Sequence, residues 1–129
     1  MSNLTGSRPT ILIVDDTPDN IMLLSNLLKD RYNTKVANSG GTALQILAGG
    51  AQVDLILLDV MMPEIDGFET CRRLKSDPRT SAIPVIFLTA RALPEDEALG
   101  RELGAVDYLS KPVNPVTLFS RVSQHISGK

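Results

Sequence analysis

The sequence lacks several features that would point to particular classes of protein. Its 129 residues contain no tryptophan and only one cysteine, Cys71. A single cysteine cannot form a disulfide within the chain or a multi-thiolate zinc site, so we expect neither. No apolar run approaches the roughly 20 residues that span a bilayer, and the start "MSNLTGSRPT" lacks the basic and apolar regions of a secretion signal. We therefore expect a cytoplasmic protein without membrane association.

The sequence also lacks an excess of positive charge. It has 13 basic and 15 acidic residues, a formal net charge of -2 and no basic run, so we expect no direct binding to nucleic acid. The 43% hydrophobic and 22% charged residues are typical of a folded globular domain. We predict a flexible N-terminal segment over residues 1–9 and a single domain over residues 10–127.

Short apolar runs, each bounded by turn residues, are the main structural signal in the chain. They cover residues 10–14, 35–37, 53–58, 84–88 and 106–109. The run Ile11 to Val14 shows no alternation of polar and apolar residues, which is typical of a parallel strand covered by helices on both faces. We predict that these runs are the strands of one parallel sheet.

The segments between the runs have helical spacing. Predicted helices span residues 18–30, 41–48, 64–76, 94–103 and 115–126. Thr17 is placed to cap the first helix, and Asn114 precedes Pro115 at the start of the last. Gly100 lies inside the fourth helix and costs about 1 kcal/mol relative to alanine, which predicts a pliable helix. On the fifth helix we expect the apolar stripe to face the core, with Val116, Phe119, Val122 and Ile126.

Five strand–helix units in about 120 residues predict an α/β doubly wound fold, with right-handed crossovers and helices on both faces of the sheet. In such open sheets, ligands bind beyond the carboxyl ends of the strands. The polar residues at those ends are Asp15, Asp16, Asp59, Thr89 and Lys111. Each alone is an ordinary residue after a strand, but all would meet at one edge of the sheet.

Together these residues make a coherent chemical set. Three crowded carboxylates repel one another unless a divalent cation lies between them, and oxygen ligands favour Mg²⁺. Lys111 and Thr89 supply the donors needed to hold a tetrahedral anion such as a phosphoryl group. Aspartate can act as a nucleophile toward phosphorus, and Asp59, on the central run, is the best placed carboxylate.

Four motifs carry a resemblance to a known family. They are "VDD" (14–16), "LLDVMMPEIDG" (57–67), "LTA" (88–90) and "KP" (111–112), separated by intervals that fit one strand–helix unit or more. From Ile11 to about Ile126 the chain resembles the receiver domain of a two-component response regulator. The resemblance implies a flavodoxin-like (βα)5 fold with strand order 2-1-3-4-5. It also implies that Asp59 accepts a phosphoryl group from a histidine kinase or a histidine phosphotransfer protein.

The resemblance also implies roles for individual residues. Mg²⁺, for which Mn²⁺ can substitute, would be held by Asp16, Asp59 and the Met61 carbonyl, with Asp15 acting through water. The phosphoryl oxygens would be held by Thr89, the Ala90 amide and Lys111.

Control of the signal is implied in the same way. Thr89 and Tyr108 would act as the switch, and Met61 and Arg91 would set the rate of dephosphorylation. The surface of the fourth helix, fifth strand and fifth helix would contact a partner, an attached output domain or a second copy of the chain. The segment from Tyr108 to Ile126 resembles receivers attached to cyclic-dinucleotide enzymes or sensor kinases.

Other functions fit the sequence less well. A magnesium-dependent aspartyl phosphatase needs a second acid two residues after its nucleophile, where this chain has Met61. A nucleotide-binding module needs a glycine-rich loop after the first strand, whereas "VDDTPDN" is acidic and has no glycine. A receiver that binds partners without phosphorylation stays open as an alternative, although every residue needed for phosphorylation is present.

Overall fold

The computed structural model describes residues 8–127. Our prediction of a flexible N-terminal segment therefore falls mainly on residues outside this range. Arg8 and Pro9 are described, and they lie against the edge of the domain. Nη1 of Arg8 donates to the carbonyl of Lys29 at 2.8 Å, and the carbonyl of Pro9 accepts from the amide of Asn33 at 3.0 Å.

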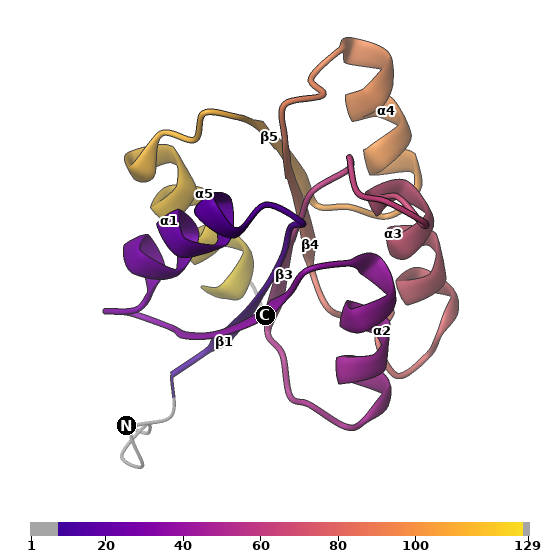
Figure 1. Ribbon diagram of the computed structural model, residues 1–129, viewed down its shortest axis with the longest axis horizontal. Helices are drawn as coiled ribbons and strands as arrows, with labels where there is room; N and C mark the ends of the chain where they lie inside the picture. Colours follow the sequence, from indigo (N-terminus) through magenta and orange to yellow (C-terminus); the bar gives the residue numbers. More distant parts are fainter. Residues whose placement is uncertain (1–7, 128–129) are drawn as a thin grey trace.

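The centre of the structure is one sheet of five parallel strands (Figure 1). The strands are β1 (Thr10–Val14), β2 (Asn33–Ala37), β3 (Leu55–Leu58), β4 (Val85–Thr89) and β5 (Asp107–Ser110). Their order is β2-β1-β3-β4-β5, which confirms the predicted flavodoxin-like topology. Val14 pairs with Leu58, and Leu58 pairs with Phe87, so β1 and β3 end at the same height and β4 continues two residues further, to Thr89.

The helices cover both faces of the sheet. They are α1 (Pro18–Leu28), α2 (Gly40–Ala48), α3 (Gly67–Ser76), α4 (Pro94–Glu102) and α5 (Pro115–Ser127). Figure 1 shows α1 and α5 on one face and α2, α3 and α4 on the other. None of the helices within residues 8–127 is long and apolar enough to cross a bilayer.

Two apolar cores lie on either side of the sheet, and successive strand residues alternate between them. Leu12 and Val14 of β1 belong to the core under α2 and α3, whereas Ile11 and Ile13 belong to the core under α1 and α5. Because both faces are buried, every position of β1 from Ile11 to Val14 is apolar. This explains why the sequence shows continuous apolar runs rather than alternation.

The predicted start of α3 at Glu64 was wrong. The helix begins at Gly67, because Oδ1 of Asp66 caps it by accepting from the amide of Glu69 at 2.9 Å. Glu64 has a φ of 69°, in the left-handed region, which a right-handed helix cannot include.

Two further predictions about helices were confirmed only in part. Thr17 is the N-cap residue of α1, as predicted, but its side chain makes no capping hydrogen bond. Val116 is 77% exposed and does not face the core, because it lies on the opposite side of α5 from the fully buried Leu118 and Val122. Leu118, which is fully buried, takes the first inward position of that helix.

Candidate functional site

Three carboxylates converge at the carboxyl ends of β1 and β3. Asp15, Asp16 and Asp59 each offer an oxygen, and these oxygens lie within 4.8 Å of one another. Asp15 and Asp59 are 2% and 6% exposed, whereas Asp16 is open to solvent. The strands bring them together because β1 and β3 are neighbours in the sheet and pair in register up to Val14 and Leu58.

Lys111 places one positive charge against this cluster. Its Nζ donates to Oδ2 of Asp15 at 2.7 Å and to Oδ2 of Asp59 at 3.0 Å. Burial lowers the pKa of Lys111, but the hydrogen bonds to Asp15 and Asp59 outweigh it, so the net pKa is raised and the ammonium stays charged. The peptide bond from Lys111 to Pro112 is cis.

The loops hold the other oxygens of the two buried carboxylates. Oδ1 of Asp15 accepts from the amide of Thr17 at 2.9 Å, and Oδ1 of Asp59 accepts from the amide of Met61 at 3.2 Å. Both carboxylates are thereby fixed in orientation by backbone donors two residues further along the chain. The side chain of Met61 is 59% exposed beside the cluster.

The chain after Asp59 is held against it by Gly67. The amide of Gly67 donates to the carbonyl of Val60 at 2.8 Å. A Cβ at position 67 would lie 2.1 Å from the Asp59 carbonyl oxygen and 2.8 Å from the Val60 Cα, both of them backbone atoms. Only glycine allows this approach, so Gly67 shapes the loop that follows Asp59.

Thr89, Arg91 and Tyr108 form a linked set beside the acidic cluster. Thr89 ends β4 and is fully buried, and its Oγ1 accepts from the amide of Arg91 at 3.1 Å. The hydroxyl of Tyr108 donates to the carbonyl of Arg91. Tyr108 is 8% exposed, and its ring packs 5.5 Å from that of Phe87. Burial, followed by the negative charge of Asp96, raises the pKa of Tyr108 to about 12.

The donor set at the acidic cluster fits a hard dication. Three carboxylates face a single ammonium, so negative charge is left over at the site. Carboxylate oxygens at this spacing suit Mg²⁺, which retains several water ligands and needs few from the protein. The exposed side of the cluster, at Asp16, gives such an ion access to water.

A family model described as the response regulator receiver domain matches residues 11–123. The chain belongs to the response regulator receiver domain family. The match covers the acidic cluster, Thr89 and Lys111, and so includes every element that builds the site. Receiver domains of response regulators take phosphate from histidine kinases and generally bind Mg²⁺ at an acidic pocket.

Several known proteins are similar to this receiver domain. A probable cyclic di-GMP phosphodiesterase of Vibrio cholerae is 54% identical over 95% of this chain, but the chain spans only 28% of that protein's length. The receiver domain of a signal transduction histidine kinase from Syntrophus aciditrophicus is 40% identical, with a TM-score of 0.85 and coverage of 93% and 91% of the two chains.

A third relative adds information about metal binding in the family. The receiver domain of the sensor histidine kinase PA1611 from Pseudomonas aeruginosa is 29% identical, with a TM-score of 0.85 and coverage of 94% and 99%. Its crystal structure has a magnesium ion coordinated in the active site cleft. The three carboxylates of this receiver domain are the candidate ligands for an equivalent ion.

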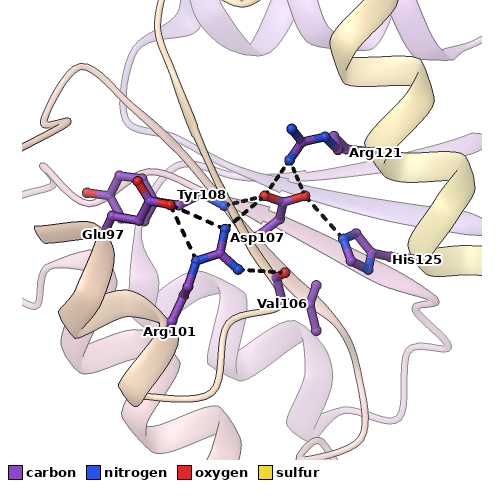
Figure 2. A network of polar contacts seen from close by, with 7 residues as sticks. All are labelled: Glu97, Arg101, Val106, Asp107, Tyr108, Arg121 and His125. Carbon is purple, nitrogen blue, oxygen red and sulfur yellow. Dashed lines mark hydrogen bonds and ion pairs between the residues drawn. The ribbon is translucent and has the colours of Figure 1, made fainter. Parts of the chain in front are cut away.

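The structure also shows a second polar cluster that the sequence analysis missed (Figure 2). Asp107, at the start of β5, is 4% exposed, and both its oxygens lie 2.7 Å from Nη1 of Arg121. His125 Nε2 lies 3.2 Å and Arg101 Nη2 3.4 Å from the same carboxylate. Asp107 thus joins α4 and α5 across the edge strand. The spacing of Arg121 and His125, one helical turn apart, was the available signal in the sequence.

Proposed function

We propose that this receiver domain accepts a phosphoryl group on Asp59 from a phosphohistidine of a histidine kinase or histidine phosphotransfer protein. A carboxylate oxygen of Asp59 forms a bond to phosphorus, the bond from phosphorus to the histidine nitrogen breaks, and the imidazole takes up a proton. The observation that supports this best is the position of Asp59. It is buried, oriented by the Met61 amide and paired with Lys111 at the end of a central strand.

The metal in this proposal is Mg²⁺, with Mn²⁺ able to replace it. Asp16, Asp59 and the Met61 carbonyl would bind the ion directly, and Asp15 would act through water. The close spacing of the three carboxylates supports the assignment. When bound, the ion shares the negative charge that develops on the transferred phosphoryl group.

The residues of the chain would hold the phosphoryl oxygens. Lys111 already lies beside Asp59 and keeps its charge, so it needs no large movement to contact the new group. Thr89 ends the neighbouring strand β4 and Ala90 follows it, so the Thr89 hydroxyl and the Ala90 amide would be the other donors. The Thr89 oxygen accepts a hydrogen bond from Arg91 and retains its own proton for donation to a phosphoryl oxygen.

The signal would leave the site through Thr89 and Tyr108. Both contact the backbone of Arg91, so movement of the Thr89 hydroxyl is linked to the position of Tyr108. The responding surface would be that of α4, β5 and α5, which carries the exposed apolar residues Leu93, Leu99 and Val116. We propose that this surface controls a partner, an attached output domain or a second copy of the chain.

Attack of water on the aspartyl phosphate would end the signal. The side chains of Met61 and Arg91 are partly exposed beside the site and would set how readily water enters. The domain would catalyse only its own phosphorylation and dephosphorylation, in the cytoplasm. The similarity to a probable cyclic di-GMP phosphodiesterase supports an output in cyclic-dinucleotide metabolism.

The test is incubation with Mg²⁺ and acetyl phosphate, followed by mass spectrometry of the intact chain. The native chain should gain the mass of one phosphoryl group, and Asp59→Asn should gain none. Asp30→Asn is a matched control, because it makes the same chemical change at an exposed position after α1. No gain on the native chain would favour a receiver that binds partners without phosphorylation. An equal gain on Asp59→Asn would show that another residue is modified.

A further inference from the structure

Asp96, in the first turn of α4, is a buried carboxylate outside the acidic cluster. It is 5% exposed, and its Oδ1 accepts from Nε of Arg91 at 3.0 Å. Its Oδ2 is the one buried side-chain polar atom within residues 8–127 that makes no hydrogen bond. Burying a carboxylate with one oxygen unbonded costs free energy, so the single ion pair compensates the burial of Asp96 only in part.

The ion pair is also the polar attachment of the first turn of α4, whereas Arg101 attaches the last turn to Val106 and Asp107. The only buried residues within this helix are Asp96 and Gly100. Gly100 lies directly on the aromatic rings below it, because a Cβ there would be 3.0 Å from both the Phe87 and the Tyr108 rings. With no buried aliphatic side chain in its span, α4 depends on the contact between Asp96 and Arg91 to hold its first turn.

Arg91 connects this attachment to the phosphoryl site. Its amide donates to Thr89 and its carbonyl accepts from Tyr108. Its guanidinium lies 5.7 Å from the centre of the Phe68 ring, and Phe68 follows Gly67, whose backbone packs against that of Asp59. Half of the Arg91 side chain is exposed, which leaves the guanidinium free to turn on its flexible stem.

A phosphoryl group on Asp59 would give Arg91 a second anionic partner. Leu58 pairs with Phe87, so Asp59 and Thr89 end adjacent strands that lie about 4.8 Å apart. The phosphoryl group carries more negative charge than one carboxylate and presents three acceptor oxygens, in a geometry that suits a guanidinium. The incompletely bonded Asp96 is the weaker partner of the two.

We propose that Asp96 is a positioning residue that holds Arg91 away from Asp59 until Asp59 is phosphorylated, whereupon the guanidinium leaves Asp96 for the phosphoryl oxygens. Asp96 then loses the one charged partner that it has within residues 8–127, and the first turn of α4 is released from the domain. The exchange links the chemistry at Asp59 to the surface of α4, and it rests on the proposed function. Arg91 is expected to protect the phosphoryl group from water after the exchange.

The test is the lifetime of the phosphorylated protein, measured by intact mass after removal of acetyl phosphate. Asp96→Asn should lengthen the lifetime about fivefold, a coupling typical of side chains in contact, because Arg91 is then available without breaking an ion pair. In an Arg91→Gln background, Asp96→Asn should have no effect on the lifetime. An unchanged lifetime in Asp96→Asn, or the same lengthening without Arg91, would overturn the proposal.

Glu97→Gln is the matched control. Glu97 is the next residue of α4, is half exposed and pairs with Arg101 rather than Arg91. The Glu97→Gln variant should have the same lifetime of the phosphorylated protein as the native chain. A lengthening equal to that of Asp96→Asn would show a general effect of charge on α4 instead of the exchange. A role of Asp96 in folding alone would lower the melting temperature without making the lifetime depend on Arg91.

A second measurement needs no variant at position 96. The NMR signal of the Arg91 Nε–H group, assigned with Arg91→Gln, should shift when Mg²⁺ and beryllium fluoride, a phosphoryl mimic, are added to the native chain. A signal that stays in place would contradict the exchange. If the native chain gains no phosphoryl mass, both the proposed function and this inference fail; if it does, a null result on lifetime or signal refutes this inference alone.

Discussion

Nζ of Lys111 lies 3.0 Å from Oδ2 of Asp59, although 52 residues separate the two in the chain. The same ammonium lies 2.7 Å from Asp15, so a single cation is shared by two buried carboxylates. Such an arrangement balances only part of the local negative charge. It leaves the site able to take up a dication and then a phosphoryl group, which are the two additions that the proposed function requires.

Replacing Lys111 by methionine should separate its role in phosphoryl transfer from its role in charge balance. The phosphorylation rate with acetyl phosphate should fall about 100-fold, as when one donor to a developing negative charge is removed. Mg²⁺ should bind at least as tightly as in the native chain, because a competing positive charge is gone. Lys35→Met, at an exposed position on β2, is the control. A rate equal to that of the control would exclude a role for Lys111 in the transfer.

Addition of Mg²⁺ should raise the melting temperature of the native chain. An ion that binds only the folded state at 100 times its dissociation constant stabilises it by about 2.7 kcal/mol. Asp16→Asn should lose most of this gain, whereas without metal it should be no less stable than the native chain, because it relieves repulsion. Chelation with EDTA should reverse the gain. If Mg²⁺ stabilised Asp16→Asn as much as the native chain, the ion would have to bind elsewhere.

Gly67→Ala should destabilise the domain by about 3 kcal/mol, the upper part of the range for overpacking, because the new Cβ would meet the backbone of Asp59. Urea unfolding gives the free energy directly. Gly49→Ala is the control, since its Cβ would have ordinary contacts of 3.5 Å and the position has a negative φ. A loss below 1 kcal/mol at position 67 would show that the loop can move away from Asp59 at little cost.

Protonation of Asp107 should make the domain less stable in acid than at neutral pH. Burial raises the pKa of Asp107, but hydrogen bonds from Arg121, the Tyr108 amide and His125 outweigh it and leave the pKa below its ordinary value. The stabilisation of the folded state by ionised Asp107 is therefore complete above the unfolded-state pKa of about 4. It is lost as the pH falls through the pKa that Asp107 has in the folded state.

Asp107→Asn tests this expectation by urea unfolding at pH 7 and pH 3. At pH 7 the variant should be less stable by about 1–3 kcal/mol, since it removes a charged partner from Arg121 and His125. The difference from the native chain should shrink at pH 3. Asp19→Asn, at an exposed position in α1, should not show this pattern. A difference that is the same at both pH values would mean that Asp107 does not titrate with unfolding.

Much of the fold could be predicted because its signals are local. Apolar runs fully buried between two helical layers, such as Ile11 to Val14, are typical of parallel strands, and the predicted strands match the observed ones within two residues. The start of α3 was missed because apolar spacing continues back through the loop from Glu64. The Asp66 cap and the left-handed backbone of Glu64 decide the boundary.

The candidate site was predicted more fully than the contacts around it. Asp15, Asp59, Thr89 and Lys111 could be placed together because parallel strands end at one edge of the sheet. The ion pair between Arg91 and Asp96 could not be predicted in this way. Acidic residues are common in the first turn of a helix because they interact favourably with the helix dipole, whether or not they form an ion pair. Whether such a residue is exposed, as Glu95 is, or buried, as Asp96 is, depends on what the helix packs against.

By itself, the sequence determined the order of strands and helices, the edge of the sheet where chemistry takes place and the residue types available there. These follow from periodicity and from the fixed direction of parallel strands. Only the tertiary structure decided that Lys111 is shared by Asp15 and Asp59, that Tyr108 turns inward to Arg91, and that Gly100 allows α4 to approach the Phe87 and Tyr108 rings. Those contacts join residues from separate elements, and their geometry depends on how close the layers pack, which no local pattern encodes.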